Sequence, residues 1–156
     1  MSSERRTVPL SSYLETHYVV FLGERAVTVR VGRTAPELDA VLDALDATSG
    51  VFITAANPRS EWQSEGANAA ANARMAALLR EGNWRVLPHV GRSADGDWAE
   101  EGFFVLDLDP RVGLALAEGF GQFAIVAIER SLSARLLLTD LARPDAGDEE
   151  PGLSPR

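Results

Sequence analysis

The sequence predicts an α+β protein: a two-layer sandwich with a ferredoxin-like βαββαβ core, to which an N-terminal hairpin and helix are added. Between Val51 and Ile128, apolar runs and amphipathic segments follow the order strand, helix, strand, strand, helix, strand. This is the split βαβ order, in which helices cover one face of a sheet. Alternating valines before it (Val27, Val29, Val31) indicate a further half-buried strand. A hydrophobic content of 46% in 156 residues is enough for one conventional core.

The elements before the core are a predicted hairpin and a predicted helix. The two strands are residues 18–22 and 26–31, joined by a turn at Gly23. Thr34 and Glu37 have the spacing of a capping box, which places a helix start there. Apolar residues then recur at helical spacing, and Gly50 is predicted to end the helix.

The core elements follow from the same periodicities. A buried strand is expected at 51–55, and a helix from Glu65 to Glu81 has its apolar stripe at Ala71, Met75, Leu78 and Leu79. Asp109 followed by Pro110 is typical of a helix start, since aspartate caps and proline fits the first turn. The other expected strands are residues 84–89, 103–108, 123–128 and 135–139.

The chain is predicted to hold one domain over residues 10–141 and a disordered acidic tail over residues 142–156. The tail has three prolines, mixed charges and almost nothing to bury. The first eight or so residues are expected to be loose as well.

Composition excludes several chemistries. Cysteine is absent, so disulfides, thiolate catalysis and zinc held by cysteine are ruled out. All 15 basic residues are arginine, which excludes lysine as a Schiff base or a general base. The net charge of −8 argues against a nucleic-acid partner, and no apolar run reaches the roughly 18 residues of a membrane span. We expect a cytoplasmic protein with no nucleic-acid or membrane partner and no cofactor.

The most informative stretch is the end of the strand at 51–55. The apolar run stops abruptly in Thr54, Asn57, Pro58, Arg59 and Ser60. The residue before a proline is held in an extended or turning conformation, so the strand cannot simply continue. Polar groups that gather where a strand leaves the core are typical of binding sites in such folds.

The following helix carries two amides on its apolar side. Asn68 and Asn72 are four residues apart and lie beside the stripe that includes Met75. A buried unpaired amide costs about 1–3 kcal/mol, so both must find partners, and the loop after the strand is closest in sequence. They either tie that loop down or line a polar pocket with it, and the two alternatives do not exclude each other.

An acidic turn and an isolated glutamine complete the candidates. Asp95, Asp97, Glu100 and Glu101 surround Trp98. Such a cluster could hold Mg²⁺ or Ca²⁺, but a solvated acidic turn is far commoner, and we expect no metal. Gln122 lies at a junction of helix and strand. The two histidines are isolated and carry no recognisable motif, and no hydrolase signature is present.

Four ordered motifs resemble a known family. They are Ile53-Thr-Ala-Ala-Asn-Pro58, the Asn68 and Asn72 pair, Asp97-Trp-Ala-Glu-Glu101 and Phe120-Gly-Gln122. Together they resemble the bacterial family called domain of unknown function 3293, over about Tyr13 to Ile128. Ala56 stands where an aromatic residue is expected, and Phe123 where a small polar residue is common. The resemblance implies no activity, but it marks these polar positions as the ones of interest.

The leading hypothesis is therefore a small soluble domain of unknown function that binds a small anionic or polar ligand in a polar cleft. The expected lining is Thr54, Asn57, Arg59, Asn68, Asn72, Trp98, Glu100 and Gln122, with Arg59 as the fork for an anion. One alternative is an enzyme that uses a Glu100 or Glu101 and Arg59 pair in that cleft. Another is a protein-interaction or regulatory domain with an exposed apolar patch, as on the strand at 135–139. No catalytic residue is identified.

Overall fold

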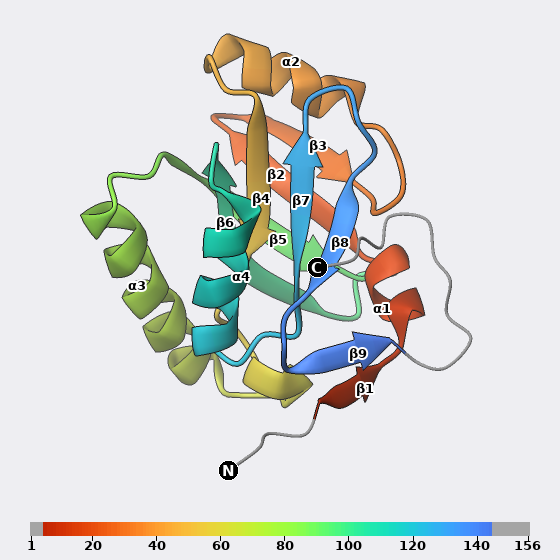
Figure 1. Cartoon of the computed structure of the whole chain (residues 1–156), viewed down its shortest axis with the longest axis vertical. Coiled ribbons are helices and arrows are strands. Elements are labelled where there is room, and N and C mark those ends of the chain that lie inside the picture. Colours follow the sequence, from red (N-terminus) through yellow and green to blue (C-terminus); the bar gives the residue numbers. More distant parts are fainter. Residues whose placement is uncertain (1–4, 145–156) are drawn as a thin grey trace.

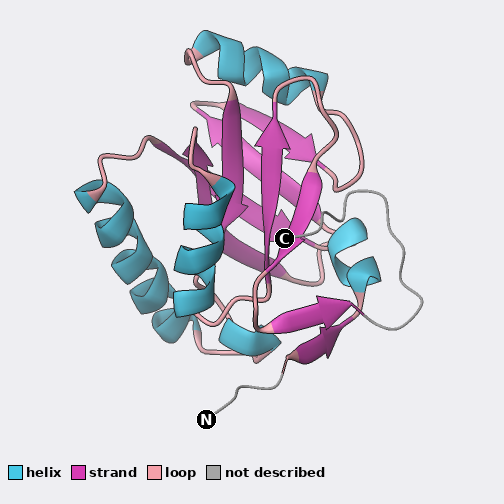
Figure 2. Cartoon of the chain, viewed as in Figure 1, coloured by secondary structure: helices cyan, strands magenta, loops and turns pink. Residues whose placement is uncertain are grey.

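A computed structural model describes residues 5–144 of the chain. Its helices are α1 (Leu10–Leu14), α2 (Pro36–Ala44), α3 (Glu65–Glu81) and α4 (Pro110–Gly119), with a short 3-10 turn, η1 (Pro58–Ser60). The strands are β1 (Arg6–Val8), β2 (His17–Leu22), β3 (Arg25–Val29), β4 (Ser49–Ile53), β5 (Val86–Arg92), β6 (Ala99–Leu106), β7 (Ala124–Glu129), β8 (Arg135–Leu138) and β9 (Ala142–Pro144). Figure 1 shows their arrangement, and Figure 2 separates helices from strands by colour.

Seven strands form one curled antiparallel sheet in the order β3-β2-β5-β6-β4-β7-β8. Every pair of neighbours in it is antiparallel, and three hairpins (β2–β3, β5–β6 and β7–β8) join strands that are consecutive in the chain. β1 and β9 form a separate parallel pair. Helices that are not interleaved with a parallel sheet define the α+β class, so this part of the prediction is confirmed.

Both faces of the sheet are packed. Alternate residues of β4 point to opposite sides: Val51 and Ile53 join the core against α3 and α4, while Phe52 joins the core that includes α1 and α2. Figure 2 shows α3 and α4 along one side of the sheet, with α2 and α1 at its top and right margins. A two-layer sandwich with helices on one face therefore describes only half of the molecule. The continuous apolar run of β4 reflects its burial on both sides.

The start of α2 and the role of Gly50 differ from the sequence prediction. α2 begins at Pro36 and has no side-chain cap, so Thr34 and Glu37 do not form the expected capping box. Proline has no amide hydrogen to satisfy at a first helical position, which removes part of the need for a cap. α2 ends at Ala44, and Gly50 lies within β4. A Cβ at Gly50 would lie only 2.1 Å from Cζ of Phe104, so glycine makes room for this ring in the core.

The helices on the other face match the prediction more closely. α3 has the predicted bounds, and Ser64 caps it by accepting a hydrogen bond from Ala67. Its buried stripe is narrower than expected, because Leu78 is 48% exposed. α4 begins as predicted, with Pro110 in the first turn and the Asp109 carboxylate accepting from the Arg111 amide at 2.8 Å.

The two ends of the described segment hold each other. The Arg6 amide donates to the Leu141 carbonyl at 2.7 Å, and β1 and β9 pair from Arg6 to Pro144. Val8 and Ala142 are buried in the core next to α1 and α2. Residues 6–8 and 142–144 are thus ordered strands, which corrects the expectation of loose ends there. Residues 145–156 of the predicted tail lie outside the described residues.

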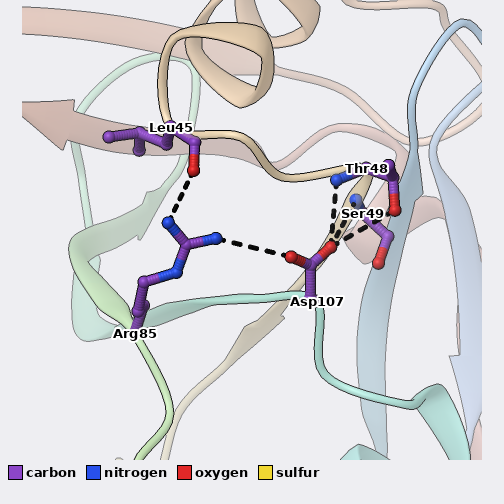
Figure 3. A network of polar contacts seen from close by, with 5 residues as sticks. All are labelled: Leu45, Thr48, Ser49, Arg85 and Asp107. Carbon is purple, nitrogen blue, oxygen red and sulfur yellow. Dashed lines mark hydrogen bonds and ion pairs between the residues drawn. The ribbon is translucent and has the colours of Figure 1, made fainter.

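A polar network fastens one end of the sheet (Figure 3). Asp107 follows β6 with a left-handed φ of 56°, and its Oδ1 accepts hydrogen bonds from the amides of Thr48 and Ser49 at 2.9 and 3.2 Å. Arg85 donates to the other carboxylate oxygen at 3.4 Å and to the Leu45 carbonyl at 2.5 Å. These bonds join the start of β4 to the end of β6. In the described part of the chain, no helix is long and apolar enough to cross a membrane.

Candidate functional site

The loop after β4 has an unusual backbone. Asn57, Arg59 and Ser60 have φ values of 46°, 58° and 58°, in the left-handed region that residues with a side chain seldom adopt. Such conformations persist only where the surroundings hold them in place. The surroundings here are a set of side-chain amides, which we call the amide latch: Asn57, Asn68, Asn72 and Gln122.

Asn57 and Asn68 bind each other twice. The backbone amide of Asn57 donates to Asn68 Oδ1 at 2.8 Å, and Asn68 Nδ2 donates to Asn57 Oδ1 at 3.0 Å. Asn57 Oδ1 also accepts from the amide of Gln63 at 2.8 Å. Asn57 is 5% exposed, so these bonds replace the hydrogen bonds to water that its polar atoms lose on burial.

Asn72 and Gln122 fix the same loop from two further elements. Asn72 Oδ1 accepts from the Ala55 amide at 3.0 Å, and Asn72 Nδ2 donates to the Glu101 carbonyl at 2.9 Å. Gln122 Nε2 donates to the carbonyl of Ala56 at 2.9 Å. The prediction that the two helix amides find partners in the Thr54–Ser60 loop is confirmed. The latch joins α3, the end of β4, β6 and the start of β7.

The amide latch also contacts a carboxylate, that of Glu100. Asn57 Nδ2 donates to Glu100 Oε2 at 2.8 Å. Glu100 lies on β6 and is partly buried, and burial raises the pKa of its carboxyl while the hydrogen bond from Asn57 lowers it by less. The Glu100 carboxyl is therefore easier to protonate than an ordinary glutamate.

A cavity of about 400 Å³ lies beside Glu100. Its walls come from β1, α1, β2, the end of β4, β5, β6, β7 and β8, so it sits on the face of the sheet opposite α3 and α4. Apolar and aromatic side chains make up most of the lining, and Glu100 is the acidic residue among them. A volume of this size is within the range of small-molecule sites, and the few polar groups in it would set orientation.

His89 forms part of the cavity wall within an aromatic group. Its ring stacks on Tyr18 with centroids 5.9 Å apart, and the ring of Phe52 lies 4.7 Å away. Its Nδ1 is 3.0 Å from the carbonyl of Val19. A carbonyl can only accept, so Nδ1 carries the hydrogen and Nε2 is left as an acceptor. Burial lowers the pKa of His89 to about 4, although the bond to Val19 opposes this, and the ring is neutral at pH 7.

Two tyrosines face the same cavity. Burial, together with the nearby charge of Glu100, raises the pKa of Tyr13 above its ordinary value. For Tyr18, burial, Tyr13 and Glu100 raise the pKa, and the Thr16 hydroxyl opposes them. Both phenols are therefore neutral hydrogen-bonding groups at physiological pH.

The eight predicted site residues fall into three places. Thr54, Trp98, Glu100 and Gln122 line the cavity. Asn57, Asn68 and Asn72 stand behind the wall and hold the loop and Glu100 in position. Arg59 is exposed and absent from the lining; its amide donates to the Gly121 carbonyl at 2.8 Å.

The sequence prediction missed Arg6, Tyr13, Tyr18 and His89, all of which line the cavity. A signal existed in the glycines of β5 and β6, since a glycine inside a strand often marks a gap or a close approach. Gly91 lines the cavity and pairs with Tyr18 across β2 and β5. Gly102 pairs with His89, and a Cβ there would lie 2.5 Å from the Ile53 carbonyl oxygen.

The acidic turn between β5 and β6 has a local explanation. The Asp95 carboxylate accepts hydrogen bonds from the Ser93 hydroxyl at 2.8 Å and from the Asp97 amide at 3.0 Å. These bonds lower the pKa of Asp95 and stabilise the turn. Within residues 5–144, no three acidic or histidine side chains gather as a metal site would need.

The apolar patch that the protein-interaction alternative expected on the strand at 135–139 does not appear on the surface. β8 lies at an edge of the sheet, but Leu136, Leu137 and Leu138 are buried. The large exposed apolar side chains among the described residues are spread over two helices and two loops: Leu78 in α3, Val112 in α4, and Trp62 and Leu132 in the loops before α3 and β8.

The fold and the site together define an α+β domain with a cavity between its curled sheet and its N-terminal segment. A model of the family described as "Protein of unknown function (DUF3293)" matches residues 53–125, which supports membership of the chain in this family. The matched segment includes the amide latch, His89, Trp98 and Glu100. Searches of curated proteins and of solved structures give no match to the chain.

Proposed function

We propose that this protein binds a small molecule in the cavity beside Glu100. The observation that carries the proposal is a cavity of about 400 Å³ that has mostly apolar walls and a carboxylate on one side. Apolar walls supply affinity through burial, and a small number of placed polar groups supplies orientation. Glu100 and the Nε2 of His89 are the polar groups we assign to this task.

The amide latch supports the proposal by explaining how Glu100 is held. A binding group works best when its position is set before the ligand arrives, because less ordering is then needed on binding. Asn57 holds one oxygen of Glu100, and Asn68 holds both the backbone and the side chain of Asn57. In this proposal Asn57, Asn68 and Asn72 position the binding group and do not themselves contact the ligand, whereas Gln122 also lines the cavity.

A second candidate is an enzyme in which Glu100 transfers a proton. The raised pKa of Glu100 favours this candidate, because a general acid or base works best when its pKa is near the working pH. The predicted partner Arg59 does not support it, since the ion pairs within residues 5–144 include neither Glu100 nor Arg59. Exchange of a ligand's acidic C–H for deuterium, lost in Glu100→Gln, would distinguish an enzyme from a binding module.

Filling the cavity tests the binding function. Ala124 lines the cavity at the start of β7, so Ala124→Leu places three additional carbons in it. Saturating ligand at about a hundred times its dissociation constant adds about 2.7 kcal/mol, which at this size raises the melting midpoint by roughly 5–10 °C. We expect such a rise in the wild type with one or more members of a panel of small amines, alcohols and acids, and little or none in Ala124→Leu.

The matched control is Ala70→Leu, the same change at an exposed position of α3. This variant should respond to the panel as the wild type does. Equal responses in the wild type and Ala124→Leu would place binding elsewhere, and a panel without any response would remove the support for a small ligand of these classes.

We also propose that β4, α3, β5, β6, α4 and β7 form the ferredoxin-like unit that the sequence suggests. The spatial order β5-β6-β4-β7 with antiparallel neighbours supports this, since it is the order that two interlocked split βαβ units produce. The bacterial origin and cytoplasmic location expected from the sequence stay parts of the same proposal.

A further inference from the structure

We propose that the ligand of this cavity is a small organic cation: an ammonium group on an apolar, ring-sized body, bound by the carboxylate of Glu100. The inference rests on the binding function proposed above and names its ligand class. It follows from the Glu100 carboxylate oxygen that has no hydrogen-bond partner among the described residues, from the groups around Glu100 and from the apolar residues of the cavity wall.

The Glu100 carboxylate lacks a counter-ion within the described residues. Oε2 accepts from Asn57, whereas Oε1 has no hydrogen-bond partner among residues 5–144. The ion pairs of the same segment do not include Glu100. A partly buried carboxylate is costly unless it is paired, so an incoming cation would remove an existing penalty as well as form a new bond.

The groups around Glu100 favour a positive charge. Tyr13, Tyr18 and Trp98 line the same cavity, and cations are attracted to aromatic rings. His89 adds an acceptor, because its Nδ1 hydrogen is committed to Val19 and its neutral Nε2 carries a lone pair. An ammonium group has three donors, which suits the two acceptors that Glu100 and His89 provide.

The rest of the cavity favours a ligand with an apolar body. Its lining beyond these polar groups includes Phe52, Phe123, Ile125, Val126 and Leu136. Burial of an apolar group against such a wall is favourable because it removes apolar surface from water. The volume of about 400 Å³ accommodates a single ring with a short side arm.

Arg6 is the charged residue that opposes this assignment. It lines the cavity from β1, but it is exposed, and its guanidinium carbon lies 5.8 Å from the centroid of the Phe123 ring. An anionic ligand would use Arg6 in place of Glu100. The sign of the ligand's charge therefore determines whether Glu100 or Arg6 binds it. The experiment must change that charge and keep the shape of the ligand similar.

The affinity for a cation should depend on pH in a definite direction. The titratable or charged groups that face Glu100 across the cavity are Tyr13, Tyr18, His89 and Arg6. Tyr13 and Tyr18 stay neutral, and His89 is neutral down to about pH 4. Burial raises the pKa of Glu100, so the preference for a cation is present above that pKa and is lost as the pH falls through it.

The test compares three probes of similar shape: 2-phenylethylamine, 2-phenylethanol and phenylacetate. Dissociation constants are measured with the full chain at pH 7.5 by protein-observed NMR titration. We expect the amine to bind more tightly than the alcohol by about tenfold or more, and phenylacetate to bind most weakly. Glu100→Gln keeps the side-chain shape and its bond with Asn57, and it should reduce the preference for the amine to about threefold or less.

The control is Glu101→Gln, which removes the same charge one residue away on the exposed side of β6. This variant should keep the full preference for the amine. Equal binding of amine and alcohol, or tightest binding of phenylacetate, would overturn the cation assignment and leave the binding function standing. Binding of none of the three would count against both.

Discussion

At the scale of single residues, Asn57 is the position on which the candidate site depends most. Its backbone is left-handed, its amide and Oδ1 bind Asn68, and its Nδ2 holds Glu100. Asparagine tolerates a left-handed backbone better than most residues do, since its short polar side chain can form local hydrogen bonds. One residue thus sets the path of the loop and the direction of a carboxylate.

We expect Asn57→Ala to lower the free energy of unfolding by about 2–4 kcal/mol, because it removes three side-chain hydrogen bonds and keeps a strained φ. Asn57→Gly loses the same bonds but relieves the strain, so its cost should be smaller by about 1 kcal/mol. Urea unfolding followed by circular dichroism measures both values. Equal costs for the two variants would show that the left-handed backbone is not under strain.

The buried ring of His89 predicts how the stability of the protein depends on pH. Its pKa is lowered in the folded state to about 4 from the unperturbed 6.5, so the unfolded chain takes up a proton first as the pH falls. The contribution of His89 to the free energy of unfolding should therefore be complete above pH 6.5 and should decrease by about 3 kcal/mol between pH 6.5 and pH 4. Ring ¹⁵N shifts should show His89 neutral, with its hydrogen on Nδ1, down to about pH 5. A protonated ring at pH 6 would contradict the burial described here.

At the scale of the elements, β4 is the strand that the rest of the molecule surrounds. It lies between β6 and β7, contributes to both cores, and leads directly into the latched loop. Its start is fastened by Asp107 and its end by Asn72. The position of the cavity wall therefore follows from how firmly β4 is held.

Gly50 tests how tightly β4 is packed. Gly50→Ala places a methyl group 2.1 Å from Cζ of Phe104, and the ring must move within a filled core. We expect a loss of about 1–3 kcal/mol in unfolding free energy. Gly66→Ala is the matched control: it lies near the start of α3, and a Cβ there meets nothing within 4 Å. That change should be neutral or stabilising by up to about 1 kcal/mol. Equal effects in the two variants would refute the packing argument.

Asp107 tests how the start of β4 is fastened. Hydrogen bonds from Thr48 and Ser49, assisted by Arg85, lower the pKa of Asp107. Its contribution to stability is therefore present above the unfolded pKa and is lost as the pH falls through the lower folded value. Because the carboxylate is largely exposed, we expect Asp107→Ala to cost about 1 kcal/mol at pH 7. Asp107→Asn keeps an acceptor and should cost less. A difference between wild type and Asp107→Ala that does not shrink below pH 3 would argue against the charged network.

At the scale of the whole molecule, the sequence predicted what depends on local patterning. The bounds of α3, the cap at Asp109 and the strand that ends in the polar loop all follow from side chains within a few residues of each other. The amides of α3 were predicted to reach the loop because an unpaired buried amide is costly. These elements required no knowledge of distant contacts.

The features that escaped prediction depend on contacts between distant segments. β1 and β9 are three-residue strands whose pairing joins Arg6 to Ala142, and neither has an apolar pattern long enough to recognise. The cavity forms only because α1 and β2 bring Tyr13 and Tyr18 to the face that carries His89 and Glu100. Arg59 was assigned from its place in the loop, but a left-handed loop can turn a side chain to either side.

The most direct measurement is an NMR titration of the full chain with 2-phenylethylamine, in the wild type and in Ala124→Leu. If the cavity is the site, the indole of Trp98 and the ring of His89 should shift in the wild type, and Arg59 should not. The same shifts should be absent or much weaker in Ala124→Leu, whose additional carbons occupy the space. Shifts centred on Arg59, or shifts of equal size in both proteins, would contradict the account.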